Sequence, residues 1–372
     1  MKLRLAARAG LALAFASSLG GAAVESIPPA AAQTVEGDLR IVRTIRESVF
    51  QVAWSPDGRH VAGLLSEGYA VWEARSGRKV AELHNGYGAF TQRDFAFSPD
   101  GKHVLVQPDL VQSRGVLKEI NGQKVVLALW NFQNRKIEGE ILGPGPILDY
   151  FLSGNGALLV AVFDRRVVVV YETRTWAPIN RFQLPVSANL AIHHSAEYMV
   201  VGAGGRYEFR ALPSGELISE ITGFVGDRYV GPLPAGDITF LGTSDRFVVT
   251  SERSGAPNLP PFEEALRILH APTGTQVASF TVPDLTITRS LSVSADGRIL
   301  GLSAEGNERY GGGPSTYRVW DTITAREIGF LRGSGTYFND AKVSRDGRFA
   351  AVVQSRLGGS GPTNILMVEI LR

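Results

Sequence analysis

The feature that most constrains this chain is a motif that recurs along it. The motif reads Val-Ala-Trp-Ser-Pro-Asp-Gly-Arg-His-Val at 52–61 and Phe-Ala-Phe-Ser-Pro-Asp-Gly-Lys-His-Val at 95–104. Five weaker copies align with these two on a serine, which gives the series Ser55, Ser98, Ser153, Ser195, Ser244, Ser294 and Ser344. The intervals between these serines run from 42 to 55 residues. A repeat of this length is typical of a unit that stacks on its neighbours to build one continuous core.

The Ser-Pro-Asp-Gly tetrapeptide predicts a tight turn between two strands. Proline presets φ at about −65°, aspartate tolerates the next position, and glycine accepts the positive φ that closes a hairpin. Before the first turn, apolar residues alternate at Phe50, Val52 and Trp54, which indicates a strand. After the turns come stronger apolar runs, such as 158–163 and 349–353. We therefore expect a first strand, a turn, and a second strand buried on both faces.

Each unit continues with two further strands. The third ends in an aromatic residue at Trp72, Trp130, Tyr171 or Trp320, and Phe209 and Leu269 sit near this position in two other units. Outer strands are predicted at 79–84, 136–142, 217–221, 276–280 and 327–331. The last unit ends with its third strand, at 364–371, and an unassigned strand at 39–45 precedes the first unit. Pairing these two closes a ring and removes an open sheet edge. The sequence therefore predicts an all-β protein, a seven-bladed β-propeller of four-stranded antiparallel blades.

Seven units of this pattern, over residues 38–372, resemble the WD40 family and its bacterial, secreted or periplasmic propeller relatives. The resemblance implies the propeller fold. It departs from the eukaryotic pattern because the Gly-His dipeptide is absent and the Trp-Asp dipeptide is complete only at Trp320-Asp321. The Asp-His-Ser-Trp hydrogen-bond network of that family is therefore not expected. Packing of the third-strand aromatic residues has to contribute more of the stability.

The N-terminus predicts a secretory signal at 1–32, followed by the propeller domain at 33–372. Lys2, Arg4 and Arg8 precede an apolar run at 11–24, and Ala30-Ala31-Ala32 offers a cleavage site. A membrane anchor is the less favoured alternative, because the run is shorter than the roughly 20 residues that span a bilayer. We expect a periplasmic protein, with secretion to the medium as the alternative.

Composition excludes several classes of function. The chain has no cysteine, so disulfides, thiol catalysis and cysteine metal sites are ruled out. Removing 1–32 takes away three of the 38 basic side chains and one of the 36 acidic ones, which leaves 35 of each. A neutral chain argues against a dedicated nucleic-acid binder, whose affinity depends on neutralising phosphates. We expect no nucleic-acid partner and no membrane span after signal cleavage.

Insertions distinguish one side of the predicted ring. Four fall between second and third strands, at 109–124, 252–264, 305–315 and 356–363. In a propeller these share a face with the connections between blades, such as 86–90 and 224–234, and we call it the loop-rich face. Aromatic and arginine side chains are the usual anchors of interfaces. The candidates on or near this face are Tyr87, Phe90, Arg114, Arg228, Tyr229, Arg253, Phe262, Arg309, Tyr310, Tyr337 and Arg356. The alternative is that these loops only cap the blades.

Catalytic signatures are absent from the sequence. There is no Gly-x-Ser-x-Gly elbow, no His-Glu-x-x-His helix and no phosphate loop. His60 and His103 occupy the same repeat position, which indicates a structural role, and His193-His194 lacks further ligands at metal-binding spacing. We therefore predict no enzyme activity, no cofactor and no metal.

The leading hypothesis is a non-enzymatic periplasmic scaffold, a monomeric propeller that presents its loop-rich face to a protein partner of the cell envelope. One alternative is an enzyme, or a small-molecule or metal binder, that uses the central channel. Candidate channel residues in or beside the first strands are Arg93, Asp94, Asp149, Asn189, Arg289, Asn339 and Asp340. A third hypothesis is a non-catalytic accessory subunit of an envelope assembly, similar to the propeller of the Tol system.

Overall fold

The computed structural model describes most of the chain from Gln33 onward. The described residues are 33–66, 68–84, 95–107, 118–164, 166–184, 189–203, 206–222, 238–250, 266–271, 273–280, 287–305, 315–333, 335–356 and 363–371. All of them belong to the unit Ala31–Arg372, and the unit Met1–Ala30 lies outside them. They form strands and turns, and they include no helix that is long and apolar enough to cross a membrane.

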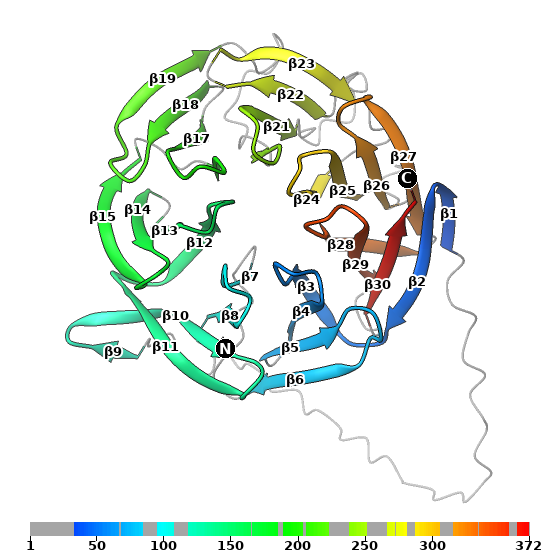
Figure 1. The fold of residues 1–372 in the computed structure, drawn as a ribbon, viewed down its shortest axis with the longest axis horizontal. Helices are drawn as coiled ribbons and strands as arrows, with labels where there is room; N and C mark the ends of the chain where they lie inside the picture. The colour runs from blue at the N-terminus through cyan, green and yellow to red at the C-terminus, as the bar shows by residue number, and fades with distance from the viewer. Residues whose placement is uncertain are drawn as a thin grey trace, which may run out of the picture. The chain divides into compact units, whose positions relative to one another are not determined.

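Seven antiparallel sheets follow one another around a ring, so the predicted seven-bladed β-propeller is confirmed (Figure 1). Blade 1 consists of β3 (Val49–Trp54), β4 (His60–Leu65), β5 (Gly68–Glu73) and β6 (Lys79–His84). Blade 2 consists of β7 (Ala96–Phe97), β8 (His103–Val106), β10 (Gln123–Asn131) and β11 (Lys136–Gly143). Blade 3 consists of β12 (Ile147–Leu152), β13 (Leu158–Phe163), β14 (Val167–Glu172) and β15 (Ala177–Gln183). In each blade the first-named strand lies nearest the ring's centre (Figure 1).

The remaining blades repeat this order. Blade 4 consists of β16 (Asn189–Ile192), β17 (Tyr198–Ala203), β18 (Arg206–Ala211) and β19 (Leu217–Thr222). Blade 5 consists of β20 (Ile238–Phe240), β21 (Arg246–Thr250), β22 (Leu266–His270) and β23 (Thr275–Phe280). Blade 6 consists of β24 (Ile287–Val293), β25 (Ile299–Glu305), β26 (Thr316–Asp321) and β27 (Arg326–Gly333). Blade 7 consists of β28 (Thr336–Val343), β29 (Phe349–Arg356) and β30 (Asn364–Ile370), with β2 (Leu39–Ile45) as its outer strand.

Two strands lie outside the four-stranded plan and were not predicted. β1 (Gln33–Gly37) pairs with β27 and gives blade 6 a fifth strand. β9 (Glu119–Ile120) pairs with the start of β10, so the end of the predicted insertion at 109–124 is a hairpin and not a loop. The hairpin turns at Asn121-Gly122, where both residues have positive φ, of 50° and 78°. Asn-Gly between two strands is the strongest short-range signal for such a hairpin, and the sequence carries it.

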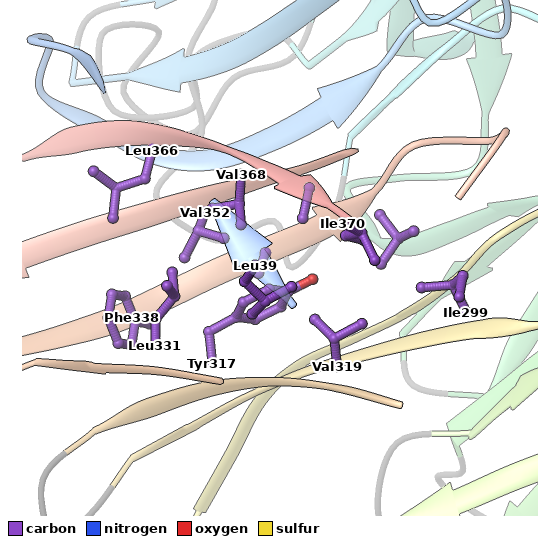
Figure 2. Close-up of a cluster of buried hydrophobic side chains, with 13 residues drawn as sticks. Leu39, Ile299, Tyr317, Val319, Leu331, Phe338, Val352, Leu366, Val368 and Ile370 are labelled. Carbon is purple, nitrogen blue, oxygen red and sulfur yellow. The ribbon is translucent and has the colours of Figure 1, made fainter. Parts of the chain in front are cut away.

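The N-terminal strand β2 is shared between two interfaces of the ring. It pairs antiparallel with β30, from Leu39 against Ile370 to Ile45 against Ile365. Leu39 packs in the cluster between blades 6 and 7, beside Tyr317 (Figure 2). Ile45, at the other end, packs in the cluster between blades 7 and 1. Burial of these two side chains therefore couples one strand to three blades.

The core lies between the blades. Seven clusters of buried apolar side chains each join a neighbouring pair of blades. β13 is buried at every residue, as predicted for a second strand. The third-strand aromatics Trp72, Trp130, Tyr171 and Trp320 are at most 3 % exposed. Trp130 Nε1 has no hydrogen-bond partner. Trp130 is therefore held by packing and not by a side-chain hydrogen bond, whereas its contribution to stability stays a prediction.

Candidate functional site

The seven turns that join first and second strands share one backbone frame, and we call the face that holds them the turn face. The amide of each turn's first residue donates to the carbonyl five residues later, at 2.7 to 3.0 Å. In blade 1 these are Ser55 N and His60 O, and Gly58 N also donates to Ser55 O. The first residues of the seven turns are Ser55, Ser98, Ser153, His193, Leu241, Ser294 and Ser344.

This frame corrects the alignment on serine in two blades. The first residue of the blade 4 turn is His193, and Ser195 is its third residue. The first residue of the blade 5 turn is Leu241, and Ser244 is its fourth. The serine alignment is therefore wrong by two and three residues there, and the true intervals run from 40 to 55 residues. The serine alignment failed because backbone hydrogen bonds define these turns. The turns of blades 4 and 5 keep those bonds without a serine at the first position.

In the regular turns the polar side chains are engaged within the turn itself. Ser55 Oγ donates to Asp57 Oδ1 at 2.6 Å and accepts a bond from His60 N at 2.9 Å. Burial acts to raise the pKa of Asp57, but the hydrogen bonds from Ser55 and Arg59 N outweigh it and lower that pKa. The same contacts recur at Ser98 and Asp100. These carboxylates brace the turns, as the repeat position suggested.

The blade 4 turn replaces this arrangement with a cluster of different chemistry. His193 Nδ1 lies 2.8 Å from Ser195 Oγ, and the ring of His193 stacks on that of Tyr198 at 4.5 Å between centroids. His193 Nε2 lies 3.5 Å from Asp245 Oδ1, which accepts a 2.7 Å bond from the Tyr198 hydroxyl. His193 is 8 % exposed, and this burial lowers its pKa. Burial and Asp245 raise the pKa of Tyr198.

Serine, histidine and aspartate are the residue types of a hydrolytic triad, but here they join two neighbouring turns. Ser195 belongs to the same turn as His193, where its hydroxyl takes the place of the Asp57 carboxylate of blade 1. Asp245 comes from the turn of blade 5. We therefore interpret the cluster as a brace between blades 4 and 5. Within the described part of the chain, no group of three His, Asp or Glu side chains is placed to hold a metal ion.

A cavity of about 480 Å³ opens at the centre of the turn face. All seven blades contribute to its wall through their first strands, and all but blade 2 also contribute one or both of the first two residues of the turn. Polar and apolar atoms contribute about equally to its wall, and Trp54, Phe97 and Phe240 are among its aromatic residues. The side chains in it that carry or can acquire positive charge are His194, Lys342 and Arg345, and none of the lining residues is acidic. We call this cavity the channel mouth.

The five predicted channel residues that the structure describes do not converge on one point. Asp340 is 5 % exposed and accepts a 2.8 Å bond from Val52 N, so it joins blade 7 to blade 1. Asp149 Oδ1 accepts a bond from the next backbone amide, and Asn339 donates to Ser355 Oγ. Asn189 begins β16 and Arg289 lies in β24, while Arg93 and Asp94 fall outside the described residues. None of the five described residues lines the channel mouth.

Most of the predicted loop-rich-face residues also fall outside the described ranges. Tyr337 lies near the start of β28 and is half-buried, and Arg356 is the last residue of β29. The other nine are Tyr87, Phe90, Arg114, Arg228, Tyr229, Arg253, Phe262, Arg309 and Tyr310. The strand bounds place the four insertions between β8 and β10, β21 and β22, β25 and β26, and β29 and β30. Because neighbouring strands are antiparallel, all four connections start and end on the face opposite the turn face.

The chain has no match among models of known protein families, nor among characterised proteins. The propeller fold rests on the strand pairing described above. Its surfaces therefore carry the functional inference, and they differ in kind. One face is built of short, hydrogen-bonded turns around a cavity, and the opposite face receives the long connections.

Proposed function

We propose that this chain is a non-enzymatic interaction propeller of the periplasm, which presents its loop-rich face to a protein partner of the cell envelope. The carrying observation is that the long connections of blades 2, 5, 6 and 7 start and end on one face of the ring. Longer connections on one side of a repeat protein often mark its binding side, because they vary without disturbing the stacked core.

The opposite face supports the same assignment by contrast. The turns that join first and second strands share one pattern of backbone hydrogen bonds. In the regular turns, the aspartate carboxylate is hydrogen-bonded inside its own turn. Carboxylates that are already bonded within their own turns offer a protein partner few new bonds. The sequence predicts, for the loop-rich face, aromatic and arginine residues of the kind that usually anchor an interface.

The cellular address of this proposal comes from the sequence. The basic residues, apolar run and Ala-x-Ala site of 1–32 support export, and the resemblance to WD40-like propellers of the bacterial periplasm supports that compartment. The absence of a catalytic motif from the sequence supports a binding role over an enzymatic one. Fold-level analogy contributes only the general expectation that propellers bind proteins.

The test is in-cell cross-linking of three tagged versions of the full chain, followed by purification and quantitative mass spectrometry. The loop-face variant replaces 252–264 with a four-residue Gly-Ser turn and carries Arg309→Ala and Tyr310→Ala. Thr250 and Leu266 are paired in the ladder, so a short turn bridges this gap without moving β21 or β22. We expect an envelope protein that the wild type recovers to fall by about tenfold or more with this variant.

The matched control carries Arg59→Gln and Arg348→Gln, two exposed side chains of the turn face. It should recover the same protein as the wild type. Equal recovery of every cross-linked protein by all three versions would contradict the assignment to the loop-rich face. Recovery of no specific protein by the wild type would contradict the interaction role itself.

A further inference from the structure

The channel mouth departs from sevenfold regularity at two turn-related positions. Two residues before each turn, five blades carry a small side chain: Ala53, Ala96, Ala191, Thr239 and Ser292. The other two blades carry Phe151 and Lys342 at this position. A repeat ring needs nothing large or charged there for its own packing, because five of its seven units do without it.

The second residue of each turn shows the same pattern. Five blades carry proline, glycine or alanine: Pro56, Pro99, Gly154, Gly242 and Ala295. Blades 4 and 7 carry His194 and Arg345 instead. The four departures, Phe151, His194, Lys342 and Arg345, all line the channel mouth. At these two positions, the side chains that depart from the repeat therefore all face one cavity.

The four side chains come from two sides of the ring. Phe151 and His194 belong to the neighbouring blades 3 and 4, whose turns are joined by a 3.0 Å bond from Asn155 N to His194 O. Lys342 and Arg345 belong to blade 7, and Figure 1 shows β28 across the ring from β12. Arg345 Nη2 reaches Gly154 O at 3.4 Å, so the blade 7 cation spans the mouth to blade 3. The lining thus combines aromatic side chains from several blades with two cations, Lys342 and Arg345, that both come from blade 7.

The charges of the mouth favour an anion. Lys342 Nζ lies 3.6 Å from Asp340 Oδ1, which partly neutralises it, and Asp340 is not among the lining residues. Arg345 is exposed, and its contact with Gly154 O is a long hydrogen bond to a neutral group. A guanidinium in this setting gains from exchanging a carbonyl for a carboxylate, because the carboxylate carries a negative charge and accepts two parallel N–H bonds from the guanidinium fork.

We propose that the channel mouth is a binding site for a small amphipathic carboxylate. Its apolar body would lie against Phe151 and the other aromatic residues of the wall, and its carboxylate would bind Arg345, with Lys342 and His194 nearby. A volume of about 480 Å³ suits a small organic molecule. An inorganic anion would leave the aromatic side chains of the cavity uncovered, and a neutral apolar molecule would leave Arg345 without a charged partner. This site is on the face opposite the loop-rich face, so it stands or falls independently of the proposed function.

Isothermal titration calorimetry on the full chain tests this site with three probes. These are 4-phenylbutyrate, its neutral counterpart 4-phenylbutan-1-ol, and inorganic phosphate. We expect one equivalent of 4-phenylbutyrate to bind, and to bind about tenfold or more tightly than either of the other two. Arg345→Gln should weaken 4-phenylbutyrate binding by about tenfold or more and leave the weak binding of the alcohol unchanged.

The matched control is Arg59→Gln, which removes an exposed arginine of the blade 1 turn that does not line the cavity. It should keep the affinity within about twofold of the wild type. Phe151→Ala should weaken both phenyl probes, but Phe151 also packs against the cluster between blades 3 and 4. If the Phe151→Ala variant unfolds, the Arg345→Gln variant still tests the proposal, because Arg345 is exposed and its replacement leaves the core intact. No binding of 4-phenylbutyrate, equal binding by Arg345→Gln, or equally tight binding of phosphate would each overturn the proposal.

Discussion

Blades 1 and 4 occupy equivalent places in the ring, and they fill these places with different side chains. Blade 1 has the full Ser-Pro-Asp-Gly turn, whereas blade 4 has His193-His194-Ser195-Ala196. Both turns keep the same backbone bonds, and Ala196 adopts a φ of 63° where Gly58 has 69°. The comparison shows that backbone hydrogen bonds fix the conformation of each turn. The side chains of a turn can then differ between blades, provided that the new side chains interact with one another.

A second exchange occurs at the end of the third strand. The register between third and outer strands shifts just before Trp72 in blade 1 and just before Arg210 in blade 4. The position near which Phe209 was placed from the sequence therefore belongs to Arg210. In place of a buried aromatic, blade 4 has a buried ionic group: Glu208 is 2 % exposed and bonds to Arg206 and Arg210, at 2.8 and 2.7 Å.

The largest expected effect comes from breaking this ionic group. Glu208→Ala should lower the free energy of unfolding by about 3–5 kcal/mol, because it leaves the partly buried Arg210 without its carboxylate. Urea denaturation with fluorescence and circular dichroism measures the change. Glu220→Gln is the matched control, since Glu220 is more exposed and lies 3.7 Å from Arg206. The control should cost less than about 1 kcal/mol. Equal losses for the two variants would show that blade 4 does not depend on the buried set.

The parts of the fold that depend on local sequence could be predicted. The outer strand predicted at 79–84 is β6, and the run at 158–163 is β13, because turn residues and apolar alternation act within a few residues. Strand β1 was missed for the opposite reason. Its five residues pair with β27, which lies nearly 300 residues later, and so short a segment gives no periodic signal of its own.

The channel mouth escaped prediction because it appears only when the seven turns are in register. In the serine alignment, His194 comes just before the reference residue of blade 4. The backbone hydrogen bonds instead make it the second residue of its turn, the position that Arg345 holds in blade 7. Phe151 and Lys342 look like ordinary strand residues until they are compared with the small residues of the other blades. Aligning the units on their predicted first strands, and not on serine, is the signal that would have found the site.

The next prediction sharpens the comparison at the level of the backbone. Gly58 has a φ of 69°, and a Cβ there would meet nothing within 4 Å. Gly242, in the irregular turn of blade 5, has a φ of 59°, but its Cβ would lie 2.5 Å from Gly297 N and 2.6 Å from Ala295 O. Gly58→Ala should therefore cost about 1 kcal/mol, from φ alone. Gly242→Ala should cost about 3 kcal/mol, because the blade 6 backbone must also move.

Both glycine variants are to be compared by urea denaturation at one pH, with the slope of each transition checked against the wild type. A larger loss at Gly58 than at Gly242 would mean that the regular turns, and not the close contact between blades 5 and 6, limit stability. It would also contradict the explanation that contact with the neighbouring blade stabilises the irregular turn of blade 5.

The smallest expected effect is a pH dependence that blade 4 has through His193. Burial lowers the pKa of His193 below its ordinary value of 6.5, so the unfolded chain takes up this proton before the folded chain does. The contribution to stability is full above about pH 6.5, and it falls as the pH drops from there to the folded-state pKa. His193→Ser, which restores the residue of the regular turns, should remove this fall. The measurement is the unfolding free energy of the wild type minus that of the variant, between pH 7.5 and pH 5.

The Asp245→Asn variant tests the direction in which the pKa of His193 shifts. Asp245 Oδ1 lies 3.5 Å from His193 Nε2 and acts, with the nearby Glu197, to raise the pKa of His193, whereas His194 lowers it. Removing the Asp245 charge should lower that pKa further, and asparagine still offers an oxygen to the Tyr198 hydroxyl. The loss of stability on acidification should then extend to lower pH than in the wild type. If the pH range of this stability loss became narrower instead, Asp245 and not burial would control the pKa of His193. Blade 4 would then contain a His193–Asp245 ion pair in place of the neutral, stacked imidazole that we infer.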